Sequence, residues 1–128
     1  MVDFKTVQKL MKCFPQSFIT SEGEVVVDRK TNQYFRLVDC KDEFDIKCKV
    51  LEWLSRAACK SEPYGTKKKN DELHNFMLNG INKYLGTEFT QEDMYKIYTY
   101  LGNRCNHLKT QEFVRRHYDM SVLKGADE

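Results

Sequence analysis

When residues 42–59 are drawn as a helix, apolar side chains occupy so much of its surface that other parts of the chain must pack against it from two sides. At about 100° per residue, one helical stripe contains Phe44, Cys48, Leu51, Leu54 and Ala58. A second stripe, displaced by roughly a third of a turn, contains Ile46, Val50, Trp53 and Ala57. The narrow polar face consists of Asp45, Lys49, Glu52 and Arg56, which pair as acid and base at i,i+4. We therefore predict that residues 42–59 form the central helix of the fold, with Trp53 buried.

The chain before this helix predicts one helix followed by three short strands. Residues 3–14 are amphipathic, with Asp3 placed to cap the helix and Pro15 placed to end it. The apolar stripe of this helix contains Phe4, Val7, Leu10, Met11 and Phe14. Three segments rich in β-branched and aromatic residues follow, at residues 17–20, 24–28 and 33–38. Turn residues separate them, so they predict a small antiparallel sheet.

The chain after the central helix predicts a loop and three further helices. The loop covers residues 60–70 and contains Pro63, Gly65 and three consecutive lysines. The first helix covers residues 71–85 and ends before Gly86. The second opens with a capping box at Thr90 and Asp93 and ends at Gly102, and a shorter helix covers residues 110–117.

These segments together predict one globular domain over residues 1–128, with a frayed tail at residues 124–128. The predicted class is α+β: an N-terminal helix, a small three-stranded antiparallel sheet, then a bundle of about four helices around the central helix 42–59. The content of 41% hydrophobic and 31% charged residues is typical of a globular protein. The apolar runs are too short to span a bilayer, and the first residues lack a signal-peptide pattern.

The cysteines favour a reducing compartment. Their number is odd and their spacing irregular, unlike a secreted disulfide framework: Cys13, Cys40, Cys48, Cys59 and Cys105. We expect reduced thiols in a cytoplasm.

No catalytic, cofactor-binding or metal-binding motif is recognisable. Glycine-rich phosphate loops, nucleophile-elbow serines and paired metal histidines do not occur in the sequence. Cys105 and His107 form the one Cys/His cluster, but adjacency in sequence does not orient a base toward a thiol. A zinc site drawn from these two with Cys59 or His74 lacks a C-x₂-C pair. The acidic residues near position 42 suit the dipole of a helix N-terminus. We predict a protein that is not an enzyme and holds no cofactor or metal.

Two sets of residues are candidates for binding. Cations beside aromatic side chains can follow a phosphate backbone and stack bases, and the nucleic-acid candidates are Tyr64, Lys67, Lys68, Lys69, Arg115 and Arg116. A net charge of only +2 weighs against this use. Tyr95 and Tyr100 project from the flanks of their predicted helix, and they are the candidates for contact with a partner protein.

Three stretches of the chain resemble small uncharacterised proteins of phages and prophages in Gram-positive bacteria. They are Asn32-Gln33-Tyr34-Phe35, residues 43–56 and residues 89–103. The resemblance covers most of the chain and rests on general sequence character without a catalytic motif. It implies a bacterial cytoplasm, and action by binding a host or phage protein, including inhibition of a host defence system. A nucleic-acid-binding protein is the alternative, and the resemblance supplies no site residues.

Overall fold

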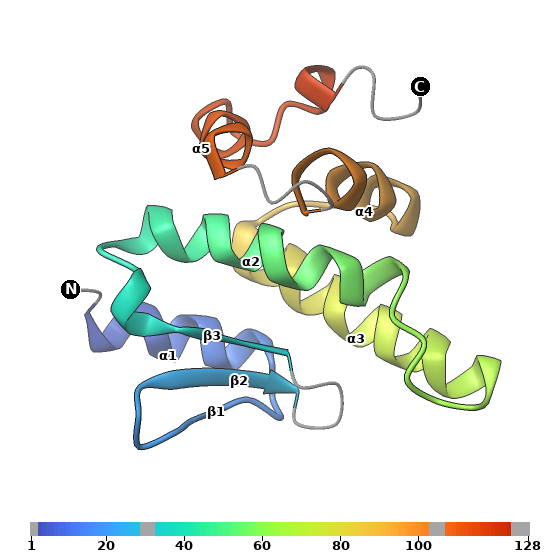
Figure 1. The fold of residues 1–128 in the computed structure, drawn as a ribbon, viewed down its shortest axis with the longest axis horizontal. Helices are drawn as coiled ribbons and strands as arrows, with labels where there is room; N and C mark the ends of the chain where they lie inside the picture. Colours follow the sequence, from blue (N-terminus) through green and yellow to red (C-terminus); the bar gives the residue numbers. More distant parts are fainter. Residues whose placement is uncertain (1–2, 29–32, 103–106, 124–128) are drawn as a thin grey trace.

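Helix α2 (Glu43–Cys59) lies at the centre of the fold in a computed structural model that describes residues 3–28, 33–102 and 107–123. The Asp42 carboxylate caps it by accepting the backbone N–H of Asp45. The sheet lies on one side of α2, and α4 (Gln91–Ile97) and α5 (His107–Arg115) lie on the other (Figure 1). Helix α3 (Lys67–Leu85) packs along it. The predicted central helix is confirmed.

Helix α1 (Phe4–Cys13) and the sheet form the N-terminal part of the fold. Asp3 caps α1, as predicted, and accepts the Thr6 N–H at 2.8 Å. The antiparallel sheet has the order β1 (Phe18–Ile19), β2 (Glu24–Asp28), β3 (Gln33–Arg36). Strand β1 has two residues, and a 3₁₀ turn, η1 (Leu37–Asp39), replaces the predicted end of β3. The prediction of a mixed helix-and-strand fold with a small antiparallel sheet is confirmed.

The C-terminal part contains two helices and two irregular turns. The capping box that opens α4 is present as predicted, with reciprocal bonds between Thr90 and Asp93. Helix α4 then continues as a π-helical turn, η2 (Tyr98–Gly102). Helix α5 begins three residues earlier than predicted, and a 3₁₀ turn, η3 (Met120–Leu123), follows it. The predictions for Cys105 and for the tail at residues 124–128 lie outside the described residues.

The start of α3 corrects the predicted loop. Lys67, Lys68 and Lys69 form the first turn of α3 rather than a flexible loop. Lysines are unfavourable at this end of a helix dipole. Two contacts offset the cost, because Thr66 caps the helix by accepting the Lys69 N–H and Asp71 pairs with Lys67 at 2.8 Å. Thr66 lies within the predicted loop and Asp71 begins the predicted helix, so neither residue alone indicates that the helix starts at Lys67.

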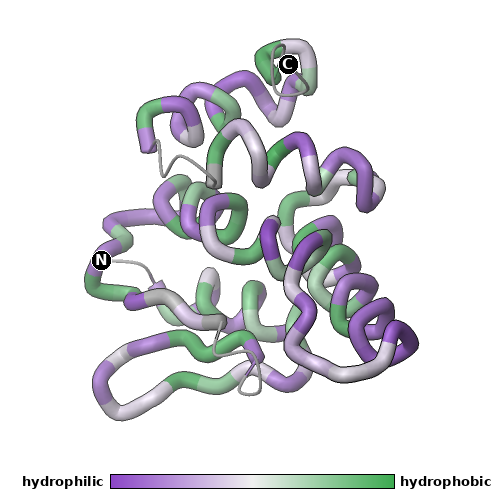
Figure 2. Tube along the Cα trace, turned by 45° about the vertical axis from the view of Figure 1, so that its right-hand side comes forward, coloured by the Kyte–Doolittle hydropathy of each residue, from purple (hydrophilic) through white to green (hydrophobic). Residues whose placement is uncertain are grey.

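The core surrounds α2, as expected, but the prediction that Trp53 is buried is wrong. The buried residues of α2 are Ile46, Cys48, Val50, Leu51, Leu54, Ser55, Ala57 and Ala58. Trp53 is 53% exposed. By the helical count it lies only about 20–40° from the buried Ile46 and Ala57, at the edge of the exposed arc. Periodicity identifies the centre of a stripe but not its edge, and no described element covers this edge. In the hydropathy colouring of Figure 2, the helices carry both hydrophilic and hydrophobic residues, as amphipathic helices around a shared core do.

Helix α1 is joined to α3 by a close approach of Phe14 to Gly80. Phe14 follows directly after α1, is fully buried, and packs edge-to-face on Phe76 at 6.2 Å between ring centroids. A Cβ placed on Gly80 would overlap the Phe14 ring, lying 2.6 Å from its Cδ1 and 2.7 Å from its Cζ. A ring enclosed on all sides cannot move away without disturbing the core.

We expect Gly80→Ala to destabilise the fold by about 1–3 kcal/mol through overpacking, although alanine is the better helix former by about 1 kcal/mol. Urea unfolding followed by circular dichroism measures this change. Gly65→Ala is the control for adding a methyl group, because no heavy atom other than those of its chain neighbours lies within 4 Å there. A Gly80→Ala protein as stable as wild type would show that Phe14 is not confined by α3.

Candidate functional site

An exposed surface of aromatic and cationic side chains lies where the C-terminal half of α2 meets α4. We call it the α2–α4 surface and define it by five residues: Trp53, Arg56, Lys60, Tyr95 and Tyr98. The first three recur at i, i+3 and i+7, which places them on one face of α2 and its C-cap. The two tyrosines come from α4 and η2, which pack on this part of α2 (Figure 1).

Cations lie over the tyrosine rings of the α2–α4 surface. The Lys60 Nζ is 4.9 Å from the ring centroid of Tyr95 and 5.4 Å from that of Tyr98. The Arg56 Cζ is 5.8 Å from the ring centroid of Tyr98. These distances are within the range of cation–π attraction, which contributes about 0.5–1 kcal/mol at exposed sites. Among the described residues, neither cation has a carboxylate partner in an ion pair. Their charge is therefore available to an incoming group.

Two of the three aromatic rings of this surface are open to solvent. Trp53 is 53% and Tyr95 43% exposed. Tyr98 is half-buried and begins the π-helical turn. Such turns are rare and often occur at functional sites. At the rim of the surface, the His107 Nδ1–H donates to the Glu52 carboxylate at 2.7 Å and ties α5 to α2.

The structure separates the two tyrosines predicted to contact a protein. Tyr95 belongs to the α2–α4 surface, under Lys60 of the α2 C-cap. Tyr100 is half-buried against the core, and the Lys109 Nζ of α5 lies 4.3 Å from its ring centroid. The two side chains thus face different neighbouring elements.

The residues predicted to contact nucleic acid do not gather on one surface. Helix α3, which begins with the three lysines, starts at the lower right of Figure 1, whereas α5 lies at the upper left. Arg116 pairs with Glu112 at 2.8 Å, and the guanidinium of Arg115 lies over the Phe44 ring. Tyr64 and Lys69 do line one hollow of about 350 Å³, but Asp28 and Glu72 line it too. The carboxylates reduce the attraction of this hollow for phosphate.

The sequence pattern does not identify Trp53, Arg56, Lys60 and Tyr98 as a group. Periodicity places Trp53 in an apolar stripe and Arg56 on the paired polar face. The available signal was the i, i+3, i+7 spacing of Trp53, Arg56 and Lys60, which aligns an aromatic ring with two cations. The tyrosines come from a segment about 40 residues later, so no local pattern could join them to this set.

The thiols of Cys40, Cys48 and Cys59 are poorly suited to nucleophilic chemistry. Burial raises the pKa of the Cys48 thiol to about 12, and burial raises the pKa values of Cys40 and Cys59 to about 11. These thiols stay protonated at neutral pH, whereas the thiolate is the reactive form. Among the described residues, no three or more His, Cys, Asp or Glu side chains are grouped so as to hold a metal ion.

Comparison with known proteins adds no relative. No protein-family model, curated protein or solved structure matches the chain. Within the described ranges, none of the helices combines the length and apolar character that a bilayer crossing requires.

Trp53 is the only tryptophan, so its emission reports the α2–α4 surface directly. We expect the folded protein to emit close to the wavelength of free tryptophan, to be quenched readily by acrylamide, and to shift little on unfolding. Trp53→Ala should change the free energy of unfolding by less than about 1 kcal/mol, whereas the matched change Leu54→Ala in the core should cost about 2–5 kcal/mol. Blue-shifted emission that resists quenching would contradict the exposed position.

The buried thiols also make stability depend on alkaline pH. Their neutral form is favoured in the folded state, while unfolded thiols ionise near their ordinary pKa of 9.0. The stabilisation is therefore complete below about pH 9 and is lost as the pH rises toward the folded pKa values of about 11 and 12. Urea unfolding at pH 7, 9 and 10.5 should show this decrease. The decrease in stability should be smaller in Cys48→Ala. A free energy of unfolding that stays constant up to pH 10.5 would contradict the prediction.

Proposed function

We propose that this chain is a non-enzymatic binding protein and that a partner protein docks on the α2–α4 surface. The observation that carries the proposal is the exposure of Trp53 beside Arg56, with Tyr95 exposed under Lys60. Tryptophan, tyrosine and arginine are the residues most enriched at the energetic centres of protein interfaces. Leaving a large indole in water on an otherwise well-packed helix has no benefit for folding, so a partner that covers it is the simplest reason for its position.

The charge of the surface indicates the chemistry of the partner. Arg56 and Lys60 lack carboxylate partners in ion pairs among the described residues, and the rings beneath them are apolar. A complementary partner presents carboxylates around an apolar depression that accepts the indole of Trp53. Electrostatic attraction of this kind mainly raises the association rate, while the buried indole mainly sets the dissociation rate.

We further propose that the partner is a host or phage protein in a bacterial cytoplasm, with inhibition of a host defence system as one form of the activity. The support is the sequence resemblance to small phage and prophage proteins. A binding surface without a recognisable catalytic centre is in keeping with such a role, although a fold alone does not define a function.

A second candidate is single-stranded nucleic acid bound at the same surface. Exposed rings beside cations can stack bases and attract phosphates, and Trp53, Tyr95 and Lys60 have this chemistry. In this second candidate function, nucleic acid contacts the α2–α4 surface instead of the three lysines at 67–69 and Arg115–Arg116. It differs from the protein-binding proposal in its dependence on salt, because each neutralised phosphate releases counterions.

A photocrosslinking amino acid at position 95 tests the proposal in the bacterial host. We expect it to capture a partner protein that the same amino acid at position 34, an exposed tyrosine position on β3, does not capture. With the partner purified, Trp53→Ala and Tyr95→Ala should each weaken binding by about 2 kcal/mol or more, as at interface hot spots.

The matched control is Leu108→Ala, because Leu108 is 76% exposed on α5 and lies outside the α2–α4 surface. It should leave the affinity unchanged, and circular dichroism should show all three variants folded. Equal losses in Leu108→Ala and Trp53→Ala would exclude this surface as the interface. The crosslinker at position 95 could instead capture nucleic acid, with an affinity for oligonucleotides that falls steeply with salt. That result would favour single-stranded nucleic acid over a partner protein as the ligand of this surface.

A further inference from the structure

A second surface, which the proposed function does not use, is a hollow between α1 and α3. It has a volume of about 440 Å³, and we call it the lysine hollow. Its lining consists of Lys5, Gln8, Lys9, Lys12 and Cys13 of α1 and Lys83 of α3. None of the lining residues is acidic or aromatic. In Figure 1, α1 and α4 lie on opposite sides of α2, so the lysine hollow and the α2–α4 surface are separate.

Helix packing explains why four lysines converge there. The lining residues of α1 recur at i, i+3/i+4 and i+7/i+8, which is one face of a helix. Helix α3 is brought against α1 by the contact of Phe14 with Gly80, and Lys83 is one turn further along α3. The convergence therefore depends on the close approach of the two helices.

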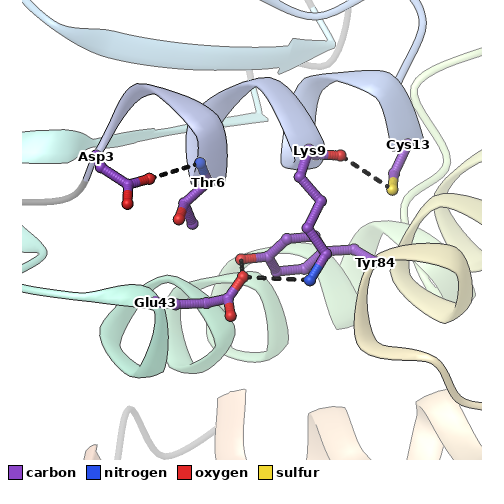
Figure 3. Close-up of polar contacts among 6 residues, drawn as sticks. All are labelled: Asp3, Thr6, Lys9, Cys13, Glu43 and Tyr84. Carbon is purple, nitrogen blue, oxygen red and sulfur yellow. Dashed lines mark hydrogen bonds and ion pairs between the residues drawn. The ribbon is translucent and has the colours of Figure 1, made fainter.

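Lys9 is held in position at the edge of the hollow. Its ammonium lies 3.4 Å from the Glu43 Oε2 and 5.5 Å from the ring centroid of Tyr84, whose hydroxyl donates to the same Glu43 oxygen at 3.2 Å (Figure 3). Helices α1, α2 and α3 thus meet at one carboxylate oxygen, which orders Lys9 and balances its charge in part.

The remaining lysines leave the hollow positively charged. Asp3 is the acidic group whose charge interacts with Lys5. Lys12 and Lys83 have no ion-pair partner among the described residues. Four lysines therefore line the hollow, while Glu43 interacts with Lys9 and Asp3 with Lys5. Like charges around one cavity repel each other, and a multivalent anion placed among them removes that repulsion.

We propose that the lysine hollow binds an oligophosphate group, a di- or triphosphate, either free or as part of a nucleotide. The volume is within the range of small-molecule sites, about 300–1,000 Å³. Ammonium groups bind phosphate oxygens through charge-assisted hydrogen bonds. Since no aromatic side chain lines the hollow among the described residues, the phosphates carry the recognition and a base adds little.

Isothermal titration calorimetry with sodium triphosphate tests the site. We expect Lys12→Gln/Lys83→Gln to weaken triphosphate binding by about tenfold or more, because two of the four cations are lost. The matched control is Lys68→Gln/Lys69→Gln, which removes the same charge from the start of α3 and should change affinity by less than about twofold. ATP and triphosphate are compared at equal ionic strength: equal affinity identifies a free oligophosphate site, and tighter binding of ATP identifies a nucleotide site.

Cys13 gives a second readout that needs no variant, because its half-buried thiol lines the hollow. Triphosphate should slow alkylation of Cys13 by iodoacetamide and leave Cys59, a half-buried thiol outside the lining, unaffected. Peptide mapping by mass spectrometry measures both thiols in one sample. Equal weakening by the two double variants, or unchanged alkylation of Cys13 at saturating triphosphate, would overturn the proposal. Duplex DNA that binds more tightly than triphosphate and depends on Lys12 and Lys83 would also overturn it, in favour of a nucleic-acid backbone.

Discussion

The enclosure of α2 determines the rest of the structure. Apolar residues occupy about 200° of its circumference by the helical count, so no single neighbour can cover it. The sheet, α3, α4 and α5 all pack against this one helix, and they are arranged around it rather than around each other. The uncovered arc holds Arg56 and Lys60 with Trp53 at its edge. The one exposed strip of the central helix is therefore also the main part of the α2–α4 surface.

Features encoded by neighbouring residues could be predicted from the sequence. Asp3 caps α1, Thr90 and Asp93 form the capping box, and β2 covers the predicted residues, because each depends on side chains a few positions apart. The exposure of Trp53 could not be predicted, since it depends on whether another element covers one edge of α2. Lys67, Lys68 and Lys69 were predicted to lie in a loop, because the local sequence does not show that a helix begins there. Thr66 and Asp71, which stabilise them in a helix, have ordinary roles in loops as well.

The two candidate sites were even less accessible from the sequence, because each joins distant segments. Tyr95 and Lys60 are 35 positions apart, and Lys12 and Lys83 are 71 apart. The net charge of +2 also gives no indication of the two sites, because positive charge is concentrated locally in the lysine hollow and on the α2–α4 surface. The two surfaces differ in chemistry. One has aromatic rings with cations above them, while the other is lined by lysine side chains and has no ring in its lining.

The π-helical turn η2 links the core to the exposed surface. Its hydrogen bonds run from i to i+5, so the turn is wider than an α-helical one. Leu101 of this turn is fully buried, whereas the Tyr98 ring lies beneath Arg56 and Lys60 of the α2–α4 surface. One short widened turn therefore anchors the end of α4 in the core and at the same time supplies a ring to the proposed interface.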